Sequence, residues 1–302
     1  MSRLDAALHR ATTGSVAEPL ERDGQEPEQD LDGKLFPVPG RTLVRQESHE
    51  PDRTSAVDRP GNEAPGEFHF EGFDPSHAEK LIVSETLPPS LREQYRRVGA
   101  LLHHTQAANG MKLIMISSAA PNEGKTLTAT NIALTLSESY QRRVLLIDAD
   151  LRRPSLDHLF QIPVIFGLSE ALSSEPERTV SVIQISKNLS LLPGGKPNSD
   201  PMSVLTSDRM RRLLAEAAAS FDWVIIDTPP VGILTDANLL GAMVDAAVLV
   251  VRAGKTSLVE VQRAVQAIGR EKILGVVLNR AERRHSSEAD SYYYASYYSS
   301  KR

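Results

Sequence analysis

The sequence predicts an α/β fold in which a mainly parallel sheet is covered by helices on both faces. Short runs of Val, Ile and Leu alternate along the chain with segments of helical spacing. Strands that are apolar throughout are typical of a parallel sheet buried on both sides. The chain has 302 residues, of which 40% are hydrophobic and 24% are charged, and this is enough to form a packed core.

The predicted elements alternate from residue 84 onward. Pro-Pro-Ser near residue 88 is a helix-start signal, and apolar residues recur behind it at helical spacing. Short apolar runs bounded by polar residues indicate strands. The expected strands are 111–117, 143–150, 222–227, 245–253 and 272–280. The expected helices are 87–106, 126–140, 207–221 and 257–269.

Residues 1–80 differ from the rest of the chain in composition. They contain 9 Lys and Arg against 17 Asp and Glu, hold 8 of the 19 prolines, and show no sustained apolar period. Such a segment cannot bury enough apolar surface to offset the entropy lost on ordering. We predict that 1–80 is largely disordered, either as a tether or partner-binding tail or as a solvated leader. We place the folded domain at 84–284 and a flexible tail at 285–302.

Composition also excludes several classes of protein. Residues 81–302 carry 25 Lys and Arg against 22 Asp and Glu, so the basic surplus of a nucleic-acid-binding protein is missing and no nucleic-acid partner is expected. The sequence has no cysteine, which excludes a disulfide scaffold, a thiolate zinc site and a cysteine nucleophile. Neither a signal-peptide core nor an apolar run of spanning length is present. We expect a cytoplasmic protein.

A phosphate-binding loop is predicted after the first strand. Residues 117–126 read SSAAPNEGKT, and Gly124-Lys125-Thr126 falls at a strand-to-helix turn. Backbone N–H groups at such a turn face a bound phosphate, the Lys reaches the β- and γ-phosphates, and the Thr ligates Mg²⁺. Ala119 replaces the first glycine of the usual G-x-x-x-x-G-K-[ST] pattern. The alternative is an ordinary turn with a chance Gly-Lys-Thr. The predicted nucleotide-binding residues of this loop are Pro121, Asn122, Glu123, Gly124, Lys125, Thr126 and Leu127.

A second Gly-Lys-Thr, at 254–256, also follows an apolar strand. Leu249, five residues before its glycine, lies inside the strand, so no loop is left to surround a phosphate. We therefore expect Lys255 to be a solvated turn residue. Arg252 either faces the nucleotide site or lies on the surface, and we favour the surface.

Carboxylates follow the next two predicted strands. Asp148 and Asp150 end the segment LLIDAD, and their spacing of two puts them on one side of a strand. Paired carboxylates are costly without a cation, which favours bound Mg²⁺; the alternative is a polar strand end in which one Asp caps the following turn. Arg152 and Arg153 either neutralise the pair or contact phosphate. Asp227 ends VIID and matches the second magnesium-binding element of P-loop NTPases.

The last predicted strand ends at Asn279. Its amide can hydrogen-bond an adenine edge, and a loop-capping role is the alternative. Because the carboxyl ends of parallel strands meet at one edge of the sheet, these groups predict a single magnesium-nucleotide site on a P-loop NTPase fold.

Five of the seven tyrosines lie in the last eleven residues, and they are Tyr292, Tyr293, Tyr294, Tyr297 and Tyr298. Exposed aromatic rings on a chain end reduce solubility and need a reason. They are either phosphate acceptors, each gaining about −1.5 to −2 charges on modification, or a peptide that docks on a groove or partner.

These motifs, in this order, resemble the bacterial tyrosine kinases (BY-kinases) of capsule and exopolysaccharide systems, in their stand-alone form. The resemblance covers residues 85–302 and rests on P-x-E-G-K-T, I-D-A-D-L-R-R-P, I-I-D-T-P-P and the tyrosine cluster. It implies a fold similar to the ParA/MinD ATPases, ATP and Mg²⁺ as cofactors, and phosphorylation of the tail between neighbouring copies. It also implies control of polysaccharide synthesis and export, with recruitment to the inner face of the membrane by an anchored co-polymerase or activator.

The resemblance implies residue roles as well. Lys125 and Thr126 would bind phosphate and Mg²⁺, and Asp227 would serve the metal. Of Asp148 and Asp150, one would serve the metal and the other would take or orient the tyrosine proton. We assign the metal to Asp148 and count both acids and Lys125 as catalytic, although the roles of the two acids can be exchanged.

One family motif is incomplete here. The contact motif E-x-x-R-x-x-R on the first helix is matched by Glu93 and Arg96, but Gly99 stands at its third position and Arg97 is displaced. We expect a homo-oligomer with an incomplete first-helix contact. The alternatives to a kinase are an ATPase switch of the ParA/MinD kind and a non-catalytic nucleotide-binding scaffold in polysaccharide assembly.

Overall fold

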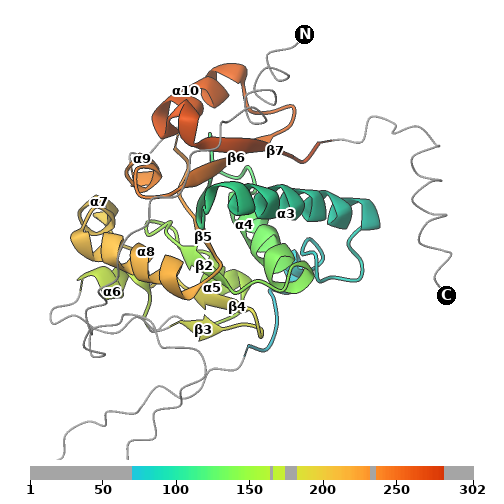
Figure 1. Ribbon diagram of the computed structural model, residues 1–302, viewed down its shortest axis with the longest axis horizontal. Coiled ribbons are helices and arrows are strands. Elements are labelled where there is room, and N and C mark those ends of the chain that lie inside the picture. The colour runs from blue at the N-terminus through green and yellow to red at the C-terminus, as the bar shows by residue number, and fades with distance from the viewer. Residues whose placement is uncertain (1–69, 164–165, 174–181, 232–235, 282–302) are drawn as a thin grey trace, which may run out of the picture. The chain divides into compact units, whose positions relative to one another are not determined.

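The computed structural model describes residues 70–163, 166–173, 182–231 and 236–281, which belong to one compact unit of the chain (Figure 1). Most of the predicted disordered segment and the whole tyrosine cluster lie outside these ranges. The interpretations placed on them therefore stay predictions.

Seven strands form one sheet in the order β3-β4-β2-β5-β1-β6-β7. Every neighbouring pair is parallel except β3 and β4. The strands are β1 (Leu113–Ser118), β2 (Val144–Asp148), β3 (Ile183–Gln184), β4 (Leu189–Leu192), β5 (Trp223–Asp227), β6 (Ala246–Arg252) and β7 (Ile273–Asn279). The five expected strands are all present, while β3 and β4 were too short to be predicted from apolar runs.

Helices cover both faces of this sheet, as predicted (Figure 1). The helices are α2 (Pro75–Ala78), α3 (Pro89–Asn109), α4 (Lys125–Leu134), α5 (Leu156–Leu159), α6 (Leu168–Ser173), α7 (Pro201–Leu205), α8 (Asp208–Ser220), α9 (Asp236–Gly241) and α10 (Leu258–Ile268). The segment η2 (Thr135–Ser139) continues α4 as a π-helix, and η3 (Arg270–Lys272) is a 3₁₀ turn. The four predicted helices are confirmed as α3, α4 with η2, α8 and α10.

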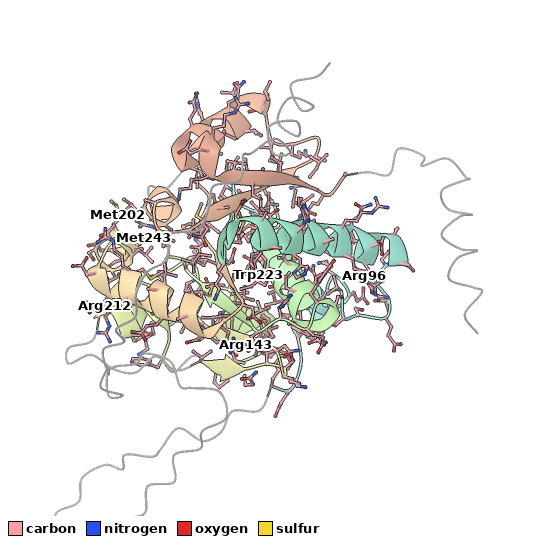
Figure 2. The ribbon with its side chains drawn as sticks, viewed as in Figure 1. Arg96, Arg143, Met202, Arg212, Trp223 and Met243 are labelled. Carbon is pink, nitrogen blue, oxygen red and sulfur yellow. The ribbon has the colours of Figure 1, made fainter. Side chains whose placement is uncertain are left out.

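Alternation along the strands divides the apolar core in two. Ile114 and Ile116 of β1 pack on the side of α3, α4 and α5, whereas Met115 packs on the side of α6 to α10. Trp223, at the start of β5, is fully buried in the α3–α4 half and lies in the middle of the described fold (Figure 2). The sheet is therefore dry on both faces, and its polar groups gather where the strands end.

The folded body begins earlier than predicted. The rings of Phe70 and Phe73 meet edge to face with centroids 5.0 Å apart, and both contact Phe160. Leu81 is completely buried in the core. The prediction of disorder is thus wrong for 70–80, because the packing partners of this stretch are far away in the sequence and leave no local period.

Gly99 is buried where α3 packs against η2. A Cβ atom at this position would lie 2.7 Å from Cε2 of Tyr140 and 3.0 Å from Cγ2 of Thr135. The Tyr140 ring is held in place, because its hydroxyl donates a hydrogen bond to the Arg96 carbonyl at 3.0 Å. Gly99, which stands at the second arginine position of the E-x-x-R-x-x-R motif, therefore serves internal packing here.

We expect Gly99→Val to lower the free energy of unfolding by about 1–3 kcal/mol, the usual cost of overpacking a close contact. Ala100→Val is the matched control, since Ala100 is exposed on the same helix and pays only the helix-propensity cost of roughly 0.5 kcal/mol. Urea unfolding followed by circular dichroism measures both. Equal losses in the two variants would show that the Tyr140 contact is not tight.

Candidate nucleotide-binding and phosphoryl-transfer site

A cavity of about 630 Å³ opens where β1, β2, β5 and β7 end. Its walls come from the loops that follow these strands and from α2. The lining residues are His77, Pro121, Asn122, Gly124, Lys125, Thr126, Leu127, Asp150, Arg152, Arg153, Ser155, Pro229, Pro230 and Arg280. Six of the eight predicted nucleotide-binding residues are among them, and basic groups outnumber the single carboxylate.

The loop before α4 has the shape that an anion site needs. Gly124, at φ 93°, is the residue before the helix, and Asn122 is also left-handed at φ 61°. A Cβ on Gly124 would collide with the amide of Asn279. Both the backbone conformation and the close approach thus require glycine, and they leave the first N–H groups of α4 directed at the cavity.

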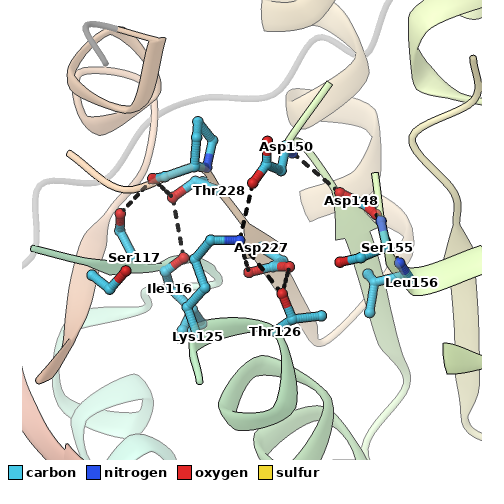
Figure 3. Close-up of polar contacts among 12 residues, drawn as sticks. Ile116, Ser117, Lys125, Thr126, Asp148, Asp150, Ser155, Leu156, Asp227 and Thr228 are labelled. Carbon is cyan, nitrogen blue, oxygen red and sulfur yellow. Dashed lines mark hydrogen bonds and ion pairs between the residues drawn. The ribbon is translucent and has the colours of Figure 1, made fainter. Parts of the chain in front are cut away.

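Lys125 is the charged centre of the site (Figure 3). Its Nζ lies 3.1 Å from Oδ2 of Asp150 and 3.6 Å from Oδ1 of Asp227. Burial alone would lower the pKa of the Lys125 ammonium, but Asp227 and Asp150 together hold it above its ordinary value. The lysine is therefore a permanent cation between the ends of two neighbouring strands.

Asp227 is fully buried, and only one of its two carboxylate oxygens accepts a hydrogen bond from a described residue. Its Oδ2 accepts a hydrogen bond from the Thr126 hydroxyl at 2.6 Å. Its Oδ1 receives no hydrogen bond from the residues that the structure describes. Burial raises the pKa of Asp227, although Lys125 and Thr126 oppose the rise.

The oxygen atoms of Thr126 and Asp227 are suitable ligands for Mg²⁺. The ion prefers oxygen ligands, takes only one or two from the protein, and keeps its remaining positions for water and phosphate oxygens. The Thr126 hydroxyl and the Asp227 carboxylate, whose Oδ1 accepts no hydrogen bond and is paired only with the Lys125 ammonium at 3.6 Å among the described residues, supply such a pair. Asp150 stands at the cavity wall on the other side of Lys125.

The structure separates the two acids that the sequence paired. The strand ends at Asp148, so Asp150 lies beyond it and the two do not share a strand face. Asp148 is fully buried and accepts backbone N–H bonds from Asp150 at 3.1 Å, Ser155 at 2.8 Å and Leu156 at 2.9 Å. The capping alternative therefore describes Asp148, while only Asp150 lines the cavity (Figure 3).

Two predicted contacts of the nucleotide are turned elsewhere. Glu123 is 2% exposed, and its carboxylate is bonded to backbone and hydroxyl groups outside the cavity. Asn279 donates from Nδ2 to the Glu123 carbonyl at 2.8 Å and accepts the Arg280 N–H. The loop-capping alternative thus fits Asn279. Lys255 is exposed, as expected, and Arg252 is half-buried.

Several lining residues were missed from the sequence. No sequence pattern marks His77 as a site residue, because it lies in the stretch predicted to be disordered. The packing of Phe70 and Phe73 on Phe160 brings this stretch to the cavity. Arg280 follows directly on Asn279, so the strand-end rule could have found it.

Comparisons with known proteins agree with this geometry. A family model described as ParA, NUBPL iron-transfer P-loop NTPase, matches residues 110–297. The match covers the P-loop, Asp227 and the strands of the parallel sheet, so it reports the shared P-loop NTPase fold. Tyrosine-protein kinase YwqD of Bacillus subtilis is 36% identical over 222 residues, which cover 72% of this chain and 93% of that protein.

The chain belongs to the bacterial tyrosine kinases. The resemblance read from the motifs, and the enzyme class that it implies, are confirmed. The kinase domain of Escherichia coli Etk is 31% identical with a TM-score of 0.58, and the match covers 65% of this chain and 79% of that one. The chimeric protein CapA2B2 is 30% identical with a TM-score of 0.63, and the match covers 68% and 91% of the two chains.

Among the described residues of this kinase, no helix combines the length and the apolar character that crossing a bilayer would take.

Asp148 predicts a pH dependence of stability. Burial, together with the charge of Asp227, raises its pKa to about 7, against the N–H bonds from Leu156 and Ser155. The folded protein therefore holds this proton more tightly than the unfolded chain, whose reference value is 3.8. Without Mg²⁺ and nucleotide, the Asp148 contribution to the unfolding free energy should fall as the pH rises from about 4 to about 7, by up to roughly 1.4 kcal/mol per pH unit.

Chemical denaturation of the wild type and Asp148→Asn across this pH range tests the expectation. The variant should show the shallower fall. Asp222→Asn is the control, since Asp222 also accepts a backbone N–H, from Arg143 at 2.9 Å, but from a partly exposed position. Parallel curves for wild type and Asp148→Asn would contradict the raised pKa.

Proposed function

We propose that this kinase transfers the γ-phosphoryl group of ATP to tyrosines of its own C-terminal cluster, presented by a neighbouring copy. The observation that carries the proposal is the Lys125 ammonium, held between Asp150 and Asp227 beside a loop of left-handed residues. Phosphoryl transfer needs positioning and charge neutralisation more than covalent chemistry, and these groups supply both.

The phosphates of ATP would lie against the loop and the start of α4. Lys125 would exchange part of its pairing with the two acids for the β- and γ-phosphates. Arg152, Arg153 and Arg280 also line the cavity and add positive charge. The orientation of the triphosphate would therefore follow from the N–H groups of the loop and from the Lys125 ammonium.

Thr126 and Asp227 would hold the metal. When bound there, Mg²⁺ would supply positive charge that offsets the charge developing on the phosphate oxygens. Oδ1 of Asp227, which accepts no hydrogen bond from the described part of the chain and lies 3.6 Å from the Lys125 ammonium, would be the oxygen that faces the ion.

Asp150 would act as the base. It lines the cavity and its oxygen is the one paired with Lys125. A bond would form between the tyrosine oxygen and the γ-phosphorus while the bond to the bridging oxygen breaks, and that electron pair would leave with ADP. The phenolic proton would pass to the Asp150 carboxylate. Asp148 would be a positioning residue. The backbone N–H bonds that its carboxylate accepts shape the turn that carries Asp150.

The setting of this activity is also part of the proposal. The kinase would control exopolysaccharide or capsule synthesis and export from the inner face of the membrane, where an anchored activator would recruit it. Support comes from the motif resemblance and from the similarity to the putative tyrosine-protein kinase CapB of Staphylococcus aureus and to the chimeric protein CapA2B2. The tail would come from a second copy in a homo-oligomer.

Mapping of phosphorylated residues tests the activity. Incubation of the full chain with Mg-ATP and a membrane activator should place phosphate within Tyr292–Tyr298, and Lys125→Ala should abolish it. The chain provides its own control, because Lys255→Ala changes the second Gly-Lys-Thr at an exposed turn and should leave labelling intact. Release of phosphate to water without any phosphotyrosine would favour the ATPase switch instead. The match to the ParA family model is the observation that favours this alternative.

Asp150→Asn separates base catalysis from binding. We expect the rate of tyrosine phosphorylation to fall by about 10²–10⁴, the usual contribution of a general base. Affinity for Mg-ADP, measured by calorimetry, should change little, because the loop and Lys125 remain. A variant that keeps the wild-type rate would remove Asp150 from the role of base.

A further inference from the structure

We propose that Glu123 is a positioning residue of the phosphate loop. Its buried carboxylate ties the loop to the turn after β6, and this tie keeps the loop in the shape that receives phosphates. The inference rests on the nucleotide-binding part of the proposed function. It gives a role to the second Gly-Lys-Thr segment, 254–256, which phosphate binding does not use.

The Glu123 carboxylate is bonded on both oxygens. Its Oε2 accepts the backbone N–H of Ala120 at 2.9 Å. Its Oε1 accepts the hydroxyl of Thr256 and, at 3.4 Å, the backbone N–H of Arg252. A carboxylate that is 2% exposed is costly to bury unless donors surround it. These donors come from the loop itself and from a turn more than 120 residues away in sequence, so the contact is a built tertiary tie.

The turn that receives Glu123 is itself well defined. The N–H of Thr256 bonds the Arg252 carbonyl at 3.1 Å, and the Thr256 hydroxyl accepts the Arg252 N–H at 3.1 Å. Ser257, the next residue, caps α10 with a capping box to Glu260. Thr256 is therefore a fixed anchor and not a mobile surface group.

β7 contributes a second tie to the same loop. Asn279 donates from Nδ2 to the Glu123 carbonyl at 2.8 Å, and its own carbonyl accepts the Ala253 N–H at 2.9 Å. The ends of β6 and β7 are thus joined to each other and to the phosphate loop. We call Glu123, Thr256 and Asn279 the loop clasp.

The loop needs such a clasp for two reasons. Glu123 lies between Asn122 and Gly124, both at positive φ, and a left-handed Asn is held only where tertiary contacts determine it. In addition, a carboxylate turned into the cavity one residue before Gly124 would repel bound phosphates. The bonds to Thr256 and Ala120 keep that charge on the other side of the loop.

Thr256→Val tests the clasp, since it removes the hydroxyl and keeps the shape. In the full chain we expect the affinity for Mg-ADP, measured by calorimetry, to weaken about tenfold, as fits the loss of one hydrogen bond to a charged group. Without nucleotide, hydrogen–deuterium exchange at the four backbone N–H groups of segment 120–124, in which Pro121 has none, should become faster. Thr256→Ser keeps the hydroxyl and should behave as the wild type, and so should Lys255→Ala in the same turn.

A double mutant makes the test specific. Glu123→Gln should also weaken Mg-ADP binding and speed exchange at 120–124. Because Thr256→Val and Glu123→Gln break one contact, the double variant should bind about as weakly as the weaker single variant. Additive losses would contradict the clasp.

The proposal is overturned if Thr256→Val binds Mg-ADP as the wild type does, or if Lys255→Ala weakens binding equally. It is also overturned if Thr256→Val lowers the melting temperature while exchange at 120–124 stays unchanged. None of these measurements depends on phosphotyrosine. A missing autokinase activity would therefore leave the test of the clasp intact, and a failed clasp would leave the test of the autokinase activity intact.

Discussion

The site depends on an electrostatic constraint: parallel strands bring buried carboxylates to one edge of the sheet, and one lysine has to balance them. Asp148 and Asp227 are paired residues of adjacent strands, β2 and β5, and both are fully buried. Burial raises the pKa of each, the charge of Asp227 raises that of Asp148 further, and the charge of Asp150 adds to the rise at Asp227. Lys125, at the first position of α4, offsets this charge without exposing it to solvent. This arrangement explains why the pKa of Lys125 stays above its ordinary value despite burial.

The same constraint explains what could be predicted from the sequence. The phosphate loop, Asp227 and the parallel sheet are local signals, because each is an apolar run followed directly by a polar group. The different roles of Asp148 and Asp150 could not be predicted from the local sequence. Asp148 ends β2 and Asp150 lies two residues further on, and only the fold turns Asp148 onto the N–H groups of Ser155 and Leu156. His77 was beyond reach, since its position depends on an aromatic cluster formed across the chain.

The two Gly-Lys-Thr segments show how little a triplet means without its surroundings. Gly124 and Gly254 are both left-handed, at φ 93° and 67°. A Cβ on Gly124 would collide with Asn279, whereas one on Gly254 would meet no atom within 4 Å. Loop residues precede Gly124 and bring its N–H to the cavity, while β6 runs almost to Gly254. The first segment therefore faces the cavity, and the second presents Thr256 to the Glu123 carboxylate.

The packing of Gly99 limits how copies of this kinase can meet. The face of α3 at Gly99 is filled by the Tyr140 ring, so it cannot carry a side chain toward another molecule. Glu93 and Arg96 remain half exposed and are paired with each other at 3.7 Å. Such an exposed pair is worth only about 0.2–1 kcal/mol, so Arg96 can change partners at little cost. If a neighbouring copy presents its tyrosines to the cavity, α3 contributes two of the three residues of the family motif, and the rest of that contact must lie elsewhere on the surface.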